Sequence, residues 1–164
     1  MKSAWVLLPV LLLSTHSVAQ SLSPGCKMLA EGRSSPAEID RFYGDKAVDI
    51  IRIGLAGDKT TLGNLIASGF SYTIQDADNF FGPRSDTGVP AAIRLAEYLE
   101  PKGYRISSPL TLLLQRKYTC IWTVTVVFEK AHNRDAVAAD FTFTDDKLSQ
   151  VVGRTMVEFR DDLH

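Results

Sequence analysis

The chain has 164 residues and a formal net charge of −1, and its lysines and arginines are scattered along the sequence. Binding to nucleic-acid phosphates needs a concentrated basic surface, so this distribution excludes a typical nucleic-acid-binding protein. The length fits a single domain that can form its hydrophobic core without a structural metal.

Residues 1–19 have the pattern of a secretory signal peptide. Lys2 precedes an apolar run from Ala4 to Leu13, and small residues lead up to Ala19. The apolar run is too short for a bilayer-spanning helix, which needs about 20 residues. We therefore expect cleavage near Ala19, export to the periplasm or the medium, and no membrane attachment afterwards.

Both cysteines, Cys26 and Cys120, follow the expected cleavage site, and export would place them in an oxidising compartment. A disulfide between them is one interpretation. The alternative is that Cys120 is a small buried apolar side chain within a strand. Cleavage removes His16 and leaves His132 and His164, without a Cys-x-x-Cys motif. We expect no metal centre and no cofactor.

Helical patterns occupy the first part of the expected domain, after a Ser-, Gly- and Pro-containing lead-in at residues 20–35. Ser35 with Glu38 forms a capping-box pattern, and apolar residues then recur at helical spacing up to Gly54, with Gly44 as a point where the helix could break. Asp58 can cap a second, shorter helix. A third helix is predicted over Val89–Leu99, closed by Pro101 and Gly103.

Strand patterns dominate the remainder. A short strand is predicted at Phe70–Ile74, and the stretch Tyr72–Gly88 reads as a connector that leads to the third helix. Alternating apolar residues predict four further strands, joined in part by turn-like segments that make neighbours antiparallel. These strands are Leu110–Arg116, Tyr118–Glu129, Val137–Thr144 and Leu148–Phe159. The fold class is α+β, with three helices on a mostly antiparallel sheet.

The order of these features resembles the nuclear transport factor 2-like superfamily, which includes SnoaL-like and ketosteroid isomerase-like proteins. The matching segments include Leu55–Asp58, Leu65–Thr73, Gly88–Ile93 and Ala139–Phe143. The resemblance covers residues 36–160. It implies a cone of three N-terminal helices packed on a curved sheet around an apolar pocket, in a superfamily that holds both enzymes and non-catalytic modules.

Isomerase-like members use a carboxylate base, a tyrosine on the first helix and a protonated aspartate on a late strand. The matching positions here hold Thr73 or Ile74, Ile50 and Ala139, which supply none of these groups. Three nearby residues stay candidates for a catalytic base or donor: Asp76, Asp78 and Tyr72. The favoured interpretation is that the two aspartates form a solvated rim and do not take part in catalysis.

The sequence therefore favours an exported, non-catalytic module that binds a small apolar ligand or a protein in its cone pocket. The alternative is an isomerase, dehydratase or cyclase that uses a rim aspartate as general base. The aromatic candidates for the pocket lining are Tyr72, Phe81, Trp122, Phe141 and Phe143.

One face of the strand Tyr118–Glu129 carries few charges, which predicts a homodimer through the outer face of the sheet. The residues on this face are Thr119, Ile121, Thr123, Thr125 and Val127.

Overall fold

The structure of the protein, a computed structural model, describes residues 24–32, 34–76, 79–81, 86–107, 120–130 and 135–157. Three helices come first, a fourth follows two strands, and strands alone form the last part of the described chain. In chain order they are α1 (Pro24–Glu31), α2 (Pro36–Leu55), α3 (Lys59–Leu65), β1 (Ile66–Asp76), β2 (Asn79–Phe81), α4 (Val89–Leu99), β3 (Pro101–Ser107), β4 (Ile121–Lys130), β5 (Asp135–Thr144) and β6 (Lys147–Val157).

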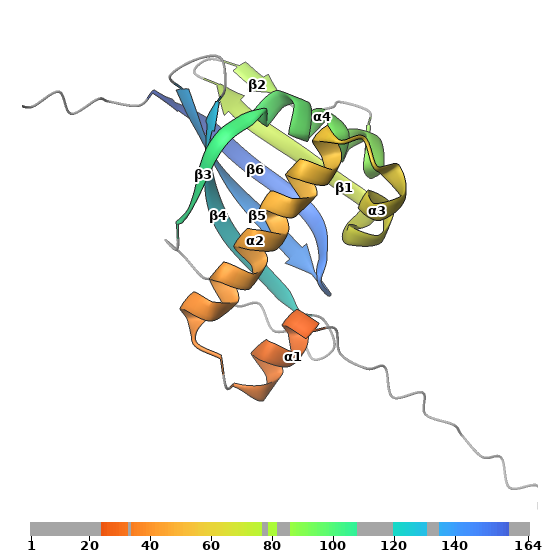
Figure 1. The fold of residues 1–164 in the computed structure, drawn as a ribbon, viewed down its shortest axis with the longest axis vertical. Coiled ribbons are helices and arrows are strands. Elements are labelled where there is room, and N and C mark those ends of the chain that lie inside the picture. Colours follow the sequence, from red (N-terminus) through yellow and green to blue (C-terminus); the bar gives the residue numbers. More distant parts are fainter. Residues whose placement is uncertain are drawn as a thin grey trace, which may run out of the picture.

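The six strands form one sheet in the order β2-β1-β6-β5-β4-β3. All neighbours are antiparallel except β1 and β6, which run parallel. The helices α2, α3 and α4 lie together on one side of the curved sheet, with α2 crossing the middle strands (Figure 1). The predicted α+β architecture, with helices packed on a mostly antiparallel sheet, is confirmed.

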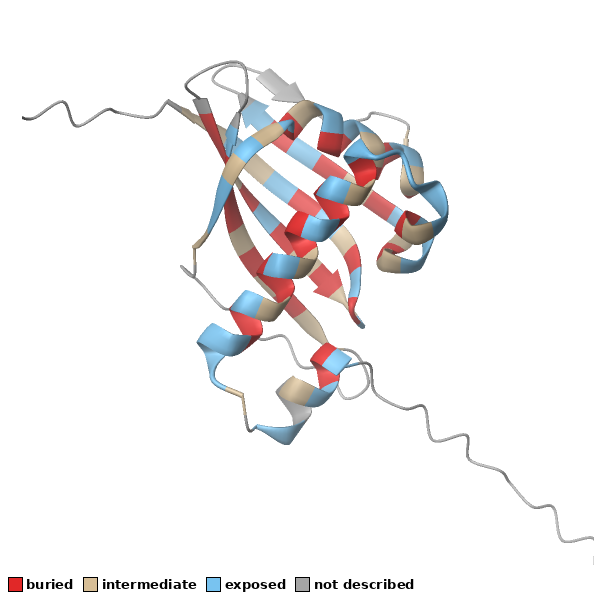
Figure 2. Ribbon diagram, viewed as in Figure 1, coloured by how far each residue is buried: buried red, intermediate tan, exposed pale blue. Residues whose placement is uncertain are grey.

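The long helix α2 begins as its sequence predicts. Ser35 is the N-cap, its hydroxyl accepts from the Glu38 backbone N–H at 3.3 Å, and Glu38 Oε2 accepts from the Ser35 backbone N–H at 2.7 Å. This capping box satisfies two amides that the helix start would otherwise leave unpaired. Apolar residues at helical spacing turn toward the sheet and are buried, while the opposite stripe of α2 is exposed (Figure 2).

The first strand is longer than predicted. β1 begins at Ile66, before the expected start at Phe70, because Ile66 already pairs with Leu148 of β6. The register then shifts, and regular pairing resumes at Ser71 with Gln150. Gly69 lies inside this irregular strand, where long-range pairing decides the conformation.

The stretch Tyr72–Gly88 is not simply a connector, which corrects the sequence-based expectation. β1 continues to Asp76 and folds back into β2, with Ile74 paired to Phe81 and Asp76 paired to Asn79. Pairing with β6 on the other side extends as far as Gln75. Cross-strand hydrogen bonds on both edges therefore hold the residues that the local turn signals assigned to a loop.

Another correction concerns the segment after α4. Pro101 and Gly103 were expected only to end the helix, but they belong to β3, which follows directly. Glu100 adopts a left-handed backbone, with φ of 31°, and so reverses the chain between helix and strand. Proline is compatible with the first residue of a strand at the edge of a sheet. The predicted strand Leu110–Arg116 lies outside the described residues.

No helix in the part of the chain that the structure describes is long and apolar enough to cross a membrane.

Gly44 does not break α2 and instead allows the helix to approach β3 closely. A Cβ atom at Gly44 would lie 2.5 Å from Cδ1 of Ile106, well inside van der Waals contact. The glycine therefore sets the distance between the helix and the edge of the sheet.

Replacing Gly44 by alanine should lower the free energy of unfolding by about 1–3 kcal/mol, because the added methyl group overpacks the contact with Ile106. Urea unfolding measures this change. Gly63→Ala is the matched control, since the nearest atom to its new Cβ would be Val89 Cγ2 at 4.0 Å. That variant should gain about 0.5–1 kcal/mol from reduced chain entropy. Equal effects of the two substitutions would contradict the role given to Gly44.

Candidate functional site

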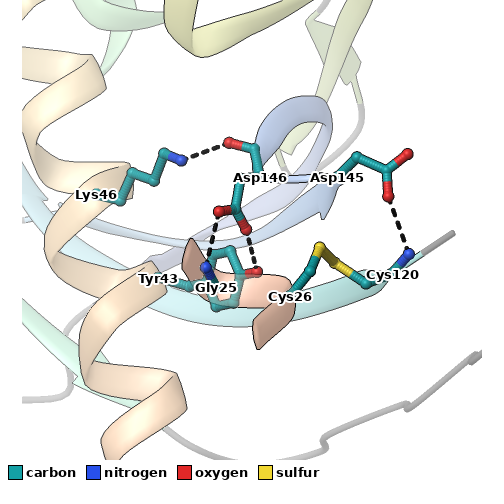
Figure 3. The surroundings of a disulfide bond; sticks show 7 residues. All are labelled: Gly25, Cys26, Tyr43, Lys46, Cys120, Asp145 and Asp146. Atoms are coloured by element: carbon teal, nitrogen blue, oxygen red, sulfur yellow. Dashed lines mark hydrogen bonds between the residues drawn. A yellow bond between two sulfur atoms is a disulfide. The ribbon is translucent and has the colours of Figure 1, made fainter. Parts of the chain in front are cut away.

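A buried carboxylate joins the N-terminal helix to the rest of the domain (Figure 3). Asp146 is only 8% exposed. Its Oδ2 accepts from the Gly25 backbone N–H of α1 at 2.8 Å, and its Oδ1 accepts from the Tyr43 hydroxyl of α2 at 2.6 Å. Lys46 Nζ donates to the Asp146 backbone oxygen at 2.5 Å. One residue thus holds α1, α2 and the β5–β6 turn together.

The β5–β6 turn presents this carboxylate in an unusual backbone conformation. Asp145 and Asp146 have φ values of 49° and 65°, in the left-handed region. A two-residue hairpin turn of this kind favours glycine, asparagine or aspartate. The turn lies between two of the strands that the sequence pattern predicts. Aspartate at these two positions supplies hydrogen-bond acceptors that glycine lacks, and both side chains accept from distant parts of the chain.

The same turn lies beside a disulfide that joins Cys26 of α1 to Cys120, just before β4. Cys120 donates its backbone N–H to Asp145 Oδ1 at 3.0 Å, and Asp145 donates its own N–H to the Cys120 oxygen at 2.9 Å. This covalent link and the hydrogen bonds explain why residues 24–31, expected to be a lead-in, form a docked helix.

The two sulfur atoms and an Asp145 oxygen lie within 4.8 Å of one another. Metal binding by cysteine requires thiolates. Because both cysteines form the disulfide, this group of atoms is not a metal centre.

Burial changes the titration of the side chains around Asp146. Loss of solvent raises the pKa of the Tyr43 hydroxyl, and the hydrogen bond to Asp146 raises it further. Loss of solvent lowers the pKa of Lys46, while the negative charge of Asp146 acts in the opposite direction. Tyr43 therefore stays a neutral donor, and the pair with Asp146 acts as a fixed structural contact near neutral pH.

A second buried carboxylate faces an open hollow. Asp40 of α2 is 5% exposed, and its Oδ1 accepts from the Trp122 indole Nε1–H at 3.0 Å. Asp40 also lines a hollow of about 640 Å³ between the N-terminal half of α2 and β3. The other charged and aromatic residues of this lining, called here the α2–β3 groove, are Glu38, Arg41, Asp45, Tyr104 and Arg105.

Three of the aromatic residues proposed to line the pocket pack against other aromatic side chains of the core. Trp122 is 3% exposed, and Phe141 and Phe143 are fully buried. The Tyr43 ring lies 4.9 Å from Phe143 and 6.4 Å from Trp122, centre to centre. Phe141 packs at 5.8 Å from Phe128. These rings fill the space between α2 and the sheet.

Tyr72 lies on β1 and is 9% exposed. Burial raises the pKa of its hydroxyl, and the positive charge of Arg94 opposes that change. Arg94 Nη2 in turn lies 2.7 Å from Asp86 Oδ2. Gly88 is the N-cap of α4 and has no side-chain cap, and the nearby Asp86 carboxylate forms the ion pair with Arg94.

Two of the remaining catalytic and lining candidates, Asp76 and Phe81, lie in the β1–β2 hairpin. Asp76 ends β1, and Phe81 ends β2, where it pairs with Ile74. Asp78 lies outside the described residues. The structure therefore brings Asp76 and Phe81 into one hairpin, at the edge of the sheet that is opposite to β3.

Sequence reasoning missed both buried aspartates. Asp40 had a detectable signal, because it precedes Tyr43 and Ala47 by three and seven positions and so shares the buried stripe of α2. A charged residue in such a stripe needs a partner. Asp146 had no comparable signal, since its neighbours read as an ordinary polar turn.

The outer face of the sheet, opposite the helices, holds another hollow of about 460 Å³. Its lining is polar and small, with one acidic and one basic side chain. Thr125 donates its hydroxyl to Asp140 Oδ1 at 2.5 Å, and the Thr123 and Thr142 hydroxyls lie 3.0 Å apart. The lining residues are Gln75, Thr123, Thr125, Ala138, Asp140, Val152, Gly153 and Arg154.

Replacing Asp146 by alanine should lower the free energy of unfolding by roughly 2–4 kcal/mol, because a buried hydroxyl and a backbone N–H would lose their acceptor. Chemical denaturation with the disulfide intact measures the loss. Glu97→Ala, an exposed substitution on α4, is the control and should change stability by no more than about 0.5 kcal/mol. A loss for Asp146→Ala no larger than the control would show that Asp146 does not anchor α1.

Comparison with known proteins finds structural neighbours only. No protein-family model matches the chain, and no curated protein matches it. An NTF2-like protein of unknown function from Silicibacter pomeroyi is similar, with 13% identity and a TM-score of 0.47, over 75% of this chain and 100% of that one. An NTF2-like protein of unknown function from Cytophaga hutchinsonii shows 11% identity and a TM-score of 0.33, over 69% and 98%.

A third similar structure comes from work on the de novo design of proteins with diverse pocket structures. It shows 10% identity and a TM-score of 0.37, over 68% of this chain and 96% of its own. Similarity at this level says nothing of what the present chain binds. The structure itself shows an α+β fold in which the helices lie on one face of a curved, mostly antiparallel sheet.

Proposed function

We propose that the chain is an exported, non-catalytic module whose partner is a protein, and that the first such partner is a second copy of the same chain bound through the outer sheet face. The observation that carries this proposal is the composition of that face. It combines small side chains with one exposed acid, Asp140, and one exposed base, Arg154, around a shallow hollow.

A non-catalytic role is supported by the use of the two buried carboxylates. Asp146 accepts from Gly25 and Tyr43, and Asp40 Oδ1 accepts from Trp122, so structural donors hold both side chains in fixed positions. General acid–base catalysis needs groups that can reach a substrate and exchange protons near the working pH. An isomerase, dehydratase or cyclase that uses Asp76 or Asp78 stays an alternative from the sequence.

Binding of a small apolar ligand receives less support than binding of a protein. Three of the five proposed lining residues, Trp122, Phe141 and Phe143, are almost entirely buried by neighbouring protein atoms. Binding at these rings would require the core to open. Interiors packed to this degree resist such changes. The outer face needs no rearrangement.

The outer face has the features of a symmetric interface. Val152 is 48% exposed, and threonines and Ala138 surround it. Asp140 pairs across the strands with Val152, so Arg154 lies two residues further along β6. In a twofold dimer, a patch that holds both signs can place Asp140 of each copy against Arg154 of the other. Neither side chain forms an ion pair with another described residue.

Light scattering on the mature chain should give a dimer at micromolar concentration. Asp140→Arg and Arg154→Asp should each weaken it at least about tenfold, because like charges then meet across the interface. The double exchange Asp140→Arg with Arg154→Asp should restore the dimer. A monomeric native chain, or a double variant that stays as weak as the single variants, would contradict the proposed pairing.

Export is supported by the disulfide, because such bonds persist in oxidising compartments. Mass spectrometry of the protein recovered from an exporting cell should show a chain that begins at Gln20 and contains no free thiol. The same chain produced without residues 1–19 in a reducing cytosol is the control, and should contain two thiols. Recovery of a chain that still begins at Met1 would contradict cleavage near Ala19.

A further inference from the structure

The α2–β3 groove holds a carboxylate that is buried but only half used. Asp40 Oδ1 accepts from Trp122 at 3.0 Å, whereas Asp40 Oδ2 has no hydrogen-bond donor among the described residues. Only 5% of the surface of Asp40 is exposed, and the residue lines the groove. A carboxylate oxygen that is buried without a donor is unfavourable, so a cationic donor would be bound favourably at such a position.

The other acids of the groove do not compete for this role. Glu38 uses Oε2 in the capping box, where it accepts from the Ser35 N–H and hydroxyl at 2.7 and 3.0 Å. Asp45 is exposed on the rim, where water screens its charge. Asp40 is therefore the point in the groove at which a positive group would gain most.

The groove also offers positive charge. Arg41 and Arg105 both line it, both are exposed, and neither forms an ion pair with another residue in the described ranges. A ligand with only a positive charge would be repelled by these two guanidinium groups. A ligand that also carries a carboxylate would instead gain from them, because arginine matches carboxylate geometry well.

The geometry points to a small zwitterion as the ligand: we infer that the α2–β3 groove binds a molecule with a primary ammonium group at one end and a carboxylate at the other. The ammonium group donates to Asp40, and the carboxylate accepts from Arg41, Arg105 or both. The exposed ring of Tyr104 forms part of the wall beside the aliphatic section. The groove volume of about 640 Å³ leaves room for an amino-acid-sized molecule. This site lies away from the proposed dimer face and does not depend on it.

Isothermal titration calorimetry on the mature, oxidised chain tests the inference with three probes of equal carbon chain length. γ-Aminobutyrate carries both charges, butylamine only the positive one and butyrate only the negative one. We expect γ-aminobutyrate to bind with a Kd of about 1 mM or lower, and each singly charged probe to bind at least about tenfold more weakly. Failure of γ-aminobutyrate to bind, or equal binding of the three probes, would overturn the proposal.

Substitutions then locate the contacts. Asp40→Asn keeps an oxygen for the Trp122 N–H but removes the charge, and should weaken γ-aminobutyrate binding at least about tenfold. Arg41→Gln with Arg105→Gln should remove the preference for γ-aminobutyrate over butylamine. Glu97→Gln, on α4, is the control and should leave the Kd unchanged. Should Asp40→Asn fail to fold by circular dichroism, the arginine variants and the three probes on the native chain still decide. Unchanged binding by a folded Asp40→Asn would place the ligand elsewhere.

Discussion

The carboxylate of Asp146 is the contact on which the N-terminal half of the domain depends. It connects a turn near the end of the chain to a helix near its beginning, through the Gly25 N–H, and to the centre of α2, through the Tyr43 hydroxyl. The atoms at this junction are also closely packed, because a Cβ atom at Gly25 would overlap both the Tyr43 hydroxyl and the Asp146 carboxylate. Glycine at this position and aspartate at the turn are therefore coupled choices.

The disulfide reinforces the same junction. Cys26 and Cys120 are separated by 94 positions, and closing a loop of that length limits the unfolded chain by about 4–5 kcal/mol in the entropic account. Hydrogen bonds between Cys120 and Asp145 place the second cysteine beside the turn. Since the covalent bond and the buried carboxylate act on adjacent residues of α1, the helix is fixed in direction as well as in position.

Sequence patterns predicted those parts of the fold that local chemistry decides. The capping box of Ser35 with Glu38 and the cap of Asp58 mark helix starts that the structure contains. The patterns misplaced elements whose conformation comes from distant pairing. β1 begins early because Ile66 meets Leu148 of β6, and the hairpin with β2 replaces an expected connector. Neither partner can be identified from the periodicity of the strand itself.

The candidate site was less predictable, because the sequence pattern of an aromatic residue is the same whether it lines a pocket or fills the core. Trp122, Phe141 and Phe143 alternate along their strands as pocket residues would, yet all three are buried in the hydrophobic core. The more informative residue was a polar one in an apolar stripe. Helical spacing places Asp40 among the buried residues of α2. A buried carboxylate needs hydrogen-bond donors, so the sequence can be searched for residues that could donate to it.

The two buried aspartates differ in the number of hydrogen-bond donors that they have among the described residues. We use this difference to distinguish a structural aspartate from one that can bind a ligand. Asp146 has a donor on each oxygen, from Gly25 and from Tyr43, and lies among elements that enclose it. Among the described residues Asp40 has one donor, from Trp122, and it also lines the α2–β3 groove. A fully satisfied carboxylate stabilises a junction and has nothing left to offer a ligand. A half-satisfied one is held in place by its first partner and keeps its second oxygen for another, so the indole of Trp122 orients Asp40 for a group that comes from outside the chain.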